Sequence, residues 1–147
     1  MSNLDDLYHE IILDHYRTPR NRGELVSPPA VRAEGFNPLC GDEITVYIDV
    51  VDGIVNDIKL TGQGCYISQA SSSLMSAAVK GKSLEAVRAT IHTFKQLMGL
   101  EEAGDAPMPS VRELGELAAL SGVVQFPVLI KCATLAWNTL SQALAEL

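Results

Sequence analysis

Between Val31 and Thr61 the spacing of apolar residues becomes alternating, and this change constrains the fold more than any other feature of the chain. Successive side chains of a strand point to opposite faces, so a period of two predicts β-structure. The alternating positions lie on both sides of an Asp52-Gly53 pair, a dipeptide typical of tight hairpin turns. This segment therefore predicts a β-hairpin whose apolar set is Ile44, Val46, Ile48, Val50, Ile54, Ile58 and Leu60.

The register of this hairpin depends on the length of its loop. A two-residue loop at Asp52-Gly53 would put the apolar sets of the two strands on opposite faces, because a one-residue slip reverses every side chain. A three-residue loop, residues 51–53, avoids this and pairs Val46 with Ile58, so we predict that register with Gly53 in a left-handed conformation. Extended outward, it places Cys40 opposite Gly64 and therefore beside Cys65.

Helical spacing appears on both sides of the hairpin. The patterns predict helices over residues 4–17, 66–79, 84–97 and 126–145, with Ser83 as the cap of the third and Pro127 in the first turn of the fourth. Ser110 and Glu113 have the spacing of a capping box, which predicts a short helix ending near Ala119. We find no repeat, no low-complexity segment and no second domain, so we expect a single domain over residues 1–147.

Size and charge exclude several classes of protein. The chain has 147 residues, enough for one domain with a sizeable core, and a formal net charge of −7. That charge argues against nucleic-acid binding and favours a partner with a basic docking face. The first ten residues lack the pattern of a secretory signal, and no apolar stretch is long enough to span a bilayer. We expect a cytoplasmic protein that binds neither nucleic acid nor membranes.

In a reducing compartment the three cysteines are thiols or metal ligands rather than disulfides. Cys65, in "GQGCYIS", stands where a strand gives way to a helix, so free amides and the helix dipole would stabilise its thiolate. The competing interpretation is a small residue in a tight turn. Taken alone, Cys132 in "FPVLIKCATLAW" is a core cysteine, and Cys40 is ambiguous.

Taken together, Cys40, Asp42, Cys65 and Cys132 form a plausible four-ligand set. Three thiolates and one carboxylate suit tetrahedral zinc, and sulfur-rich ligation also suits an iron–sulfur cluster. No C-x-x-C pair identifies the metal. We interpret the histidines, at positions 9, 15 and 92, as surface or hydrogen-bonded polar residues. Lys131, beside Cys132, either lowers the pKa of a thiol or extends into water.

The ordered combination of these segments resembles the IscU/SufU family of iron–sulfur assembly scaffolds over nearly the whole chain. The resemblance rests on "LYHEIILDHYRTPRNRGEL", "NPLCGDEITVYI", "GQGCYISQASSSLM" and "KCATLAW". It implies an α+β fold, SufE/NifU-like, in which a small antiparallel sheet of about three strands packs against helices. It also implies that Cys40, Asp42, Cys65 and Cys132 gather at one exposed end. There they would bind zinc or a transient iron–sulfur cluster, with sulfur supplied by a SufS/IscS-like cysteine desulfurase.

Two departures and one insertion indicate the subtype. IscU-type members carry a histidine where this chain has Lys131, and an "LPPVK"-like chaperone-binding stretch where this chain reads "QFPVLIK". The long gap between Cys65 and Cys132 also resembles the SufU type. These features argue against a dedicated Hsp70-type chaperone as a partner.

The resemblance leaves two mechanisms open, a scaffold that assembles a cluster and a zinc-dependent sulfurtransferase that only relays sulfur. Cys40 is our first choice for the sulfur acceptor, by resemblance to SufU, and Cys132 is the second, by resemblance to IscU. Recipient apo-proteins or other Suf components would take the product. Two different classes compete with this interpretation: a purely structural zinc module used for interaction, and a small thiol-dependent hydrolase.

Overall fold

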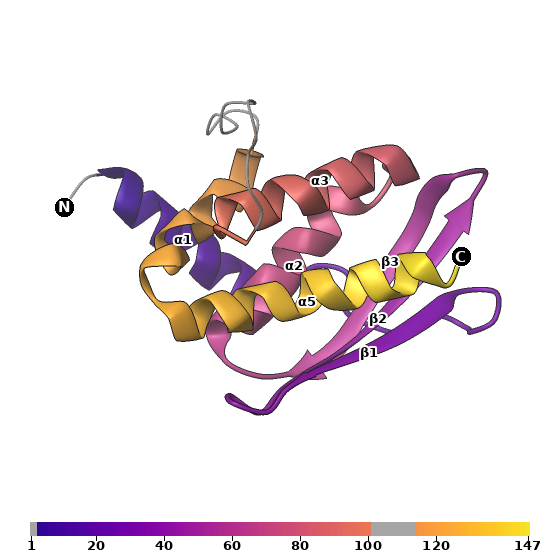
Figure 1. Cartoon of the computed structure of the whole chain (residues 1–147), viewed down its shortest axis with the longest axis horizontal. Helices are drawn as coiled ribbons and strands as arrows, with labels where there is room; N and C mark the ends of the chain where they lie inside the picture. The colour runs from indigo at the N-terminus through magenta and orange to yellow at the C-terminus, as the bar shows by residue number, and fades with distance from the viewer. Residues whose placement is uncertain (1–2, 101–113) are drawn as a thin grey trace.

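The computed structural model describes residues 3–100 and 114–147, with side chains from Leu7 onward. The strands form a three-stranded antiparallel sheet in the order β1-β2-β3. Helices α2 and α5 lie across the same face of this sheet, and α1 and α3 pack on the helices (Figure 1). This arrangement confirms the predicted α+β fold. In chain order the elements are α1 (Asn3–Arg17), β1 (Val31–Asn37), β2 (Asp42–Val51), β3 (Ile54–Gln63), α2 (Tyr66–Val79), α3 (Leu84–Leu97), η1 (Gly115–Gln125) and α5 (Pro127–Ala145).

The ends of the helices follow from their local sequence. Ser83 Oγ accepts the backbone N–H of Ala86 at 3.1 Å and so caps α3, as predicted. Pro127 occupies the first turn of α5, where its missing N–H leaves no bond unmade. The expected short helix differs: η1 is a 3₁₀-helix that continues to Gln125. The capping box expected at Ser110 and Glu113 lies outside the described residues.

The predicted register of the hairpin is wrong, and a bulge explains why. The loop has two residues, Asp52 and Gly53, both with positive φ, as a type I′ turn requires. Val51 therefore pairs with Ile54, but the register then shifts, so that Ile48 pairs with Ile58 and Val46 with Leu60. The shift falls between the pairs Asp49–Asp57 and Val50–Val55, so the extra, unpaired residue is Asn56 on β3. The bulge puts Val55, Ile58 and Leu60 on the same buried face as the apolar residues of β2, and a two-residue loop is therefore compatible with one apolar face. Ile54, which we predicted in the apolar set, is instead 46% exposed, and Val55 takes its place.

The core lies between this face of the sheet and helices α2 and α5. The inward side chains of β2 and β3 are almost fully buried, and the ring of Trp137 on α5 stacks on Phe94 of α3 with centroids 4.3 Å apart. Tyr47, on the outward face, is also buried, and the Arg32 guanidinium lies 5.9 Å from the centroid of its ring. The fully buried apolar residues of the sheet are Val46, Ile48, Val55, Ile58 and Leu60.

Helix α5 approaches the sheet most closely at Gly35 of β1. A Cβ atom at this position would overlap Thr139 Oγ1 and come within 3.1 Å of Leu135 Cδ1 and 3.3 Å of Ile44 Cγ2. Glycine is therefore required here by space, because the φ angle is not in the left-handed region. Because Gly35 has no side chain, α5 can pack close to β1 here. This short distance between strand and helix helps to fix the position of α5 on the sheet.

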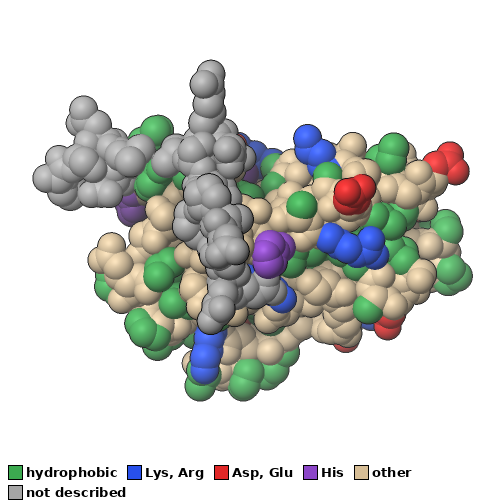
Figure 2. Space-filling view, turned by 45° about the horizontal axis from the view of Figure 1, so that its top comes forward, with side chains coloured by type: hydrophobic (Ala, Val, Ile, Leu, Met, Phe, Trp, Pro, Cys, Tyr) green, Lys and Arg blue, Asp and Glu red, His purple; other side chains and the backbone are tan. Residues whose placement is uncertain are grey.

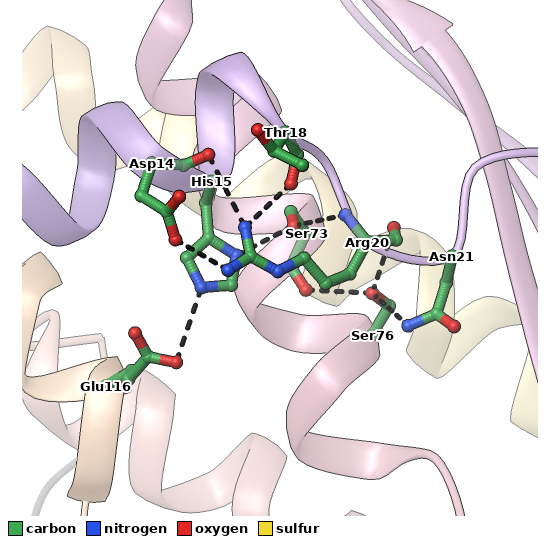
Figure 3. A network of polar contacts seen from close by, with 8 residues as sticks. All are labelled: Asp14, His15, Thr18, Arg20, Asn21, Ser73, Ser76 and Glu116. Carbon is green, nitrogen blue, oxygen red and sulfur yellow. Dashed lines mark hydrogen bonds and ion pairs between the residues drawn. The ribbon is translucent and has the colours of Figure 1, made fainter.

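A network of hydrogen bonds and ion pairs connects α1 to α2 (Figure 3). His15, on α1, is 1% exposed, and its Nδ1 lies 2.7 Å from Ser73 Oγ on α2. Ser73 Oγ also accepts the backbone N–H of Arg20 at 2.8 Å, so its own proton can be donated to Nδ1. The remaining ring proton is then on Nε2, which lies 3.5 Å from Glu116 Oε1 on η1. Burial lowers the pKa of His15, and the charge of Arg20 adds to this, so the ring is held neutral.

Gly35→Ala should destabilise the protein by about 1–3 kcal/mol, because the added methyl group overpacks the contact between β1 and α5. Urea unfolding of the two proteins measures the difference. Adding Thr139→Ala removes the nearest obstructing atom and should recover part of the loss. Full additivity of the two substitutions would contradict the contact.

The network predicts a pH dependence of stability. Because the pKa of His15 is lower in the folded state than its usual value near 6.5, the unfolded state binds more protons at acidic pH. The contribution is fully present above pH 6.5 and is lost as the pH falls below that value. The free energy of unfolding should therefore fall from pH 7 to pH 5, and His15→Gln should flatten this slope. His9→Gln, on the exposed side of the same helix, is the control; an equal slope in wild type and His15→Gln would refute the assignment.

Candidate metal centre

Three separate parts of the chain meet at one end of the sheet, and together they supply the four residues predicted from the sequence. Cys40 lies in the connection between β1 and β2, and Asp42 is the first residue of β2. Cys65 precedes α2 directly, at the end of β3, and Cys132 lies in the second turn of α5. The ligand atoms of Cys40, Asp42 and Cys132 all lie within 4.8 Å of one another. Cys65 is outside that set of three but contacts both Asp42 and Cys132.

Asp42 joins the two strand ends. It is fully buried, and its Oδ1 accepts the backbone N–H of Cys65 at 2.9 Å. Its other oxygen, Oδ2, lies 4.0 Å from Cys65 Sγ. The neighbouring Gly64 leaves room for this carboxylate, because a Cβ there would overlap Asp42 Oδ1. The carboxylate is thus held in place by backbone while Oδ2 faces a thiol.

Cys65 is the N-cap of α2. Its backbone is extended, with φ −67° and ψ 165°, and its Sγ accepts the N–H of Ser68 at 3.4 Å. A sulfur in this position accepts an amide N–H of the first turn and lies at the positive end of the helix dipole. The predicted strand-to-helix junction is therefore confirmed, and the sulfur takes the part that a serine or aspartate oxygen has in most caps.

Cys40 and Cys132 are immediate neighbours with contrasting exposure. Their sulfurs lie 3.2 Å apart, and Cys40 is exposed whereas Cys132 is 1% exposed. Burial raises the pKa of the Cys132 thiol, and its contacts with Cys40 and Cys65 raise it further. A buried thiol of this kind stays protonated unless a positive charge compensates the thiolate.

The error in the predicted register also made the predicted position of Cys40 wrong. We expected Cys40 opposite Gly64 and therefore beside Cys65. The ladder instead ends with Glu43 paired to Gln63, which puts Asp42 in the place beside Gly64. The close neighbour of Cys40 is Cys132, which is 92 residues away in sequence.

Helices α2 and α5 are held together beside the cysteines by hydrogen bonds. Ser71 Oγ on α2 donates to the backbone carbonyl of Ala133 at 2.6 Å, one residue after Cys132. The indole Nε1 of Trp137 donates to Ser71 Oγ at 3.1 Å. Because α2 begins at Cys65, these bonds couple the helices that carry Cys65 and Cys132. These contacts cannot be read from the local sequence, since the partners of Ser71 are 62 and 66 residues away along the chain.

Asn37 is a further residue of this region that sequence reasoning missed. It is the last residue of β1, its Cα pairs with that of Asp42, and it is 8% exposed. Its Oδ1 accepts the N–H of Leu39 at 3.2 Å, which shapes the turn leading to Cys40. A signal was present in "NPLC", because Asn before a Pro-containing turn has this role in many proteins, but its burial depends on β1 and α5 packing together.

The donor set fits a metal ion of borderline softness. Thiolates with one carboxylate are ligands that zinc accepts, and sulfur-rich ligation also suits iron–sulfur clusters. A metal bound here would hold the Cys132 sulfur as a thiolate, although burial raises the pKa of its thiol. His15 contacts Ser73 rather than a cysteine, and Lys131 is exposed. That these residues bind a metal remains a prediction.

The surroundings of the site are apolar and accessible. Exposed apolar side chains stand close in sequence to each of the three cysteines, and a groove of ≈ 280 Å³ runs between the end of β1 and α5. Elsewhere, charged side chains of both signs are scattered over the face shown in Figure 2. No helix among the described residues is long and apolar enough to cross a membrane. The exposed apolar residues near the cysteines are Phe36, Leu39, Tyr66, Phe126 and Val128.

Comparison with known proteins agrees with this geometry. The zinc-dependent sulfurtransferase SufU of Bacillus subtilis is 41% identical over 145 residues, covering 99% of this chain and 94% of that protein. The iron–sulfur cluster assembly scaffold protein IscU of Streptococcus pyogenes is 40% identical over 144 residues, covering 98% of this chain and 86% of that protein. These relatives confirm the resemblance to the IscU/SufU family.

Solved structures show the same fold. The FiSufU protein of Fervidobacterium islandicum has a TM-score of 0.81 at 30% identity, covering 92% of this chain and 94% of that one. A NifU-like protein (N-terminal) of Brucella abortus has a TM-score of 0.77 at 26% identity, covering 99% and 96%. A family model described as the NifU-like N terminal domain matches residues 7–146. The chain belongs to the NifU-like N-terminal domain family.

Proposed function

We propose that this protein works in iron–sulfur cluster assembly, accepting sulfur from a cysteine desulfurase at a centre formed by Cys40, Asp42, Cys65 and Cys132. One observation carries the proposal: an exposed thiol, Cys40, lies 3.2 Å from a buried thiol, Cys132, beside a fully buried carboxylate. The relatives support it, because the printed names of two of them are a zinc-dependent sulfurtransferase and a cluster assembly scaffold.

Cys40 is the proposed sulfur acceptor because it is the exposed cysteine of the set. Its thiolate would attack the outer sulfur of the persulfide on the desulfurase. A new S–S bond then forms on Cys40, the S–S bond of the desulfurase breaks, and the cysteine of the desulfurase leaves as a thiolate. Cys132, the second choice from the sequence, is buried and would receive sulfur only after Cys40 or after the site opens.

The residues that would hold zinc are Cys40, Asp42, Cys65 and Cys132. Bound zinc would keep these sulfurs deprotonated at neutral pH and protect them from oxidation. Asp42 is a harder ligand than the thiolates, and its exchange would be easier. Its Oδ1 is already hydrogen-bonded to the backbone of Cys65, so Oδ2 is the atom left for a metal. Bringing Cys65 into the set requires its sulfur to move closer to Cys40 and Cys132.

The two mechanisms differ in what leaves the site. A scaffold assembles an iron–sulfur cluster on the three cysteines as cargo and passes it to recipient apo-proteins. A relay passes only sulfur, to a recipient protein or another Suf component, and keeps its zinc. We favour a cytoplasmic protein whose apolar rim around the cysteines, Phe36 with Leu39 and Phe126, docks the desulfurase, without a dedicated Hsp70-type chaperone.

Protein purified without oxygen should contain about one zinc per chain or a cluster with matching iron and sulfide. Metal and acid-labile sulfide analysis measures both. Zinc that stays bound, with no cluster after reconstitution with iron and sulfide, would eliminate the scaffold mechanism and leave the relay. Absence of both metal and cluster would contradict the proposed centre itself.

Chelation should leave the protein folded, because the core between the sheet, α2 and α5 does not depend on the metal. Removal of the metal should lower the free energy of unfolding only by the contribution of metal binding to the folded state. This contribution is about 2.7 kcal/mol at a free metal concentration of 100 Kd. Thermal unfolding and circular dichroism of the metal-free protein measure this. Complete unfolding on chelation would favour the purely structural zinc module instead.

Cys40→Ala should abolish the stimulation of cysteine desulfurase turnover, because the exposed acceptor thiol is gone. Sulfide or alanine release by a SufS/IscS-like desulfurase measures it under single- and multiple-turnover conditions. Cys132→Ala is the comparison: stimulation lost there but kept in Cys40→Ala would reverse the order of our two acceptors. Unchanged stimulation in both would remove the sulfur-accepting role.

A further inference from the structure

Asn37 has a hydrogen-bond donor that nothing in the described part of the chain uses. The residue is 8% exposed, and its Nδ2 atom is buried without a hydrogen-bond partner among the described residues. Its oxygen is occupied, because Oδ1 accepts the N–H of Leu39. The orientation of the amide is therefore set by the turn, while its two N–H donors stay unpaired. Buried donors without partners are rare in folded proteins and destabilise them.

The position of Asn37 follows from the strand and the helix that enclose it. Gly35 and Asn37 face the same side of β1, and Gly35 lies against Leu135 and Thr139 of α5. Two residues of a strand span about 6.6 Å and one helical turn about 5.4 Å. Asn37 therefore faces the preceding turn of α5, the turn that contains Cys132. The groove that Asn37 lines together with Lys131 of that turn agrees with this placement.

Two other parts of the centre border the same amide. On the neighbouring strand the Cα partner of Asn37 is Asp42, which is fully buried. Along the chain, the turn that Asn37 shapes leads within three residues to Cys40. Asn37 is thus surrounded by the segments that carry Cys40, Asp42 and Cys132, and the sulfurs of the two cysteines lie 3.2 Å apart.

Whether a cysteine sulfur can accept the N–H groups of Asn37 depends on the charge of the sulfur. A neutral thiol is a weak hydrogen-bond acceptor, whereas a thiolate bound to a metal carries negative charge and accepts N–H groups well. Residues that contact the ligands rather than the metal orient the ligands and tune the site. An amide donor that lacks a partner in the metal-free protein would therefore find one when the centre is loaded.

We propose that Asn37 is a positioning residue whose Nδ2 donates a hydrogen bond to the thiolate of Cys40 or Cys132 in the metal-loaded centre. This inference rests on the proposed function, because it needs a metal to be bound there. The oxygen of Asn37 holds the turn before Cys40, and its nitrogen lowers the electron density on sulfur. Asn37 thereby stabilises the loaded state over the empty one.

Two substitutions separate this role from a role in the turn alone. Asn37→Ser keeps an oxygen that can accept the N–H of Leu39 but is too short to replace Nδ2. Asn37→Leu has nearly the shape of asparagine and removes both functions. Asn138→Leu is the matched control, because Asn138 lines the same groove but is exposed.

The affinity for zinc is measured by competition with a chromophoric chelator on the full chain. Asn37→Ser and Asn37→Leu should each bind zinc about 10–100-fold more weakly, and Asn138→Leu should bind as wild type does. With cobalt in place of zinc, the thiolate-to-metal charge-transfer band should move to longer wavelength in both Asn37 variants, since the sulfur regains electron density. Urea unfolding of the metal-free proteins should show no comparable loss of stability in Asn37→Ser.

Several results would overturn the inference. Wild-type affinity and an unshifted cobalt band in Asn37→Ser, with losses in Asn37→Leu alone, would assign Asn37 to the turn. Wild-type behaviour of both variants would remove it from the centre altogether. If the wild-type protein itself binds neither zinc nor cobalt, the proposed function fails, and the inference fails with it; tight binding that is insensitive to Asn37 refutes the inference alone.

Discussion

The close contact of α5 with β1 at Gly35 is the constraint on which the site depends. Because no side chain separates strand and helix at this point, α5 packs close to the sheet. The sulfur of Cys132, in the second turn of α5, then lies 3.2 Å from the sulfur of Cys40. The same contact places Asn37, two residues further along β1, against that turn. One glycine thus sets the distance between a thiol on a helix and a thiol in a strand connection.

The second constraint is hydrogen bonding between elements rather than within them. Asp42 accepts the N–H of Cys65 and joins the start of β2 to the start of α2, and Ser71 joins α2 to α5 next to Cys132. Farther from the site, Ser73 holds His15 and the backbone of Arg20 (Figure 3). Helix α2 is therefore tied along its length to α1 and α5, and the cysteine at its N-terminus has a rigid support.

The electrostatics of the centre favour a loaded state. Cys132 is a buried thiol with a raised pKa, Asp42 is a buried carboxylate, and Asn37 has an unpaired donor. Thiolates beside a carboxylate repel one another unless a cation is present, whereas the amide of Asn37 lacks an acceptor until a thiolate forms. A metal ion or a cluster would satisfy these groups together. The exposure of Cys40 leaves one corner of the arrangement open to a partner protein.

The sequence by itself determined the hairpin, the four long helices and their order, the cap at Ser83, the first-turn position of Pro127, the strand-to-helix junction at Cys65 and the family. These are local signals, because periodicity and capping act within a few residues. Tertiary structure alone decided the register of β2 and β3, since the bulge at Asn56 on β3 reconciles a two-residue turn with the need to bury apolar residues of both strands on one face. It also made Cys132 the neighbour of Cys40 and buried Asn37, because both depend on how closely α5 can approach β1, a distance that no local pattern encodes.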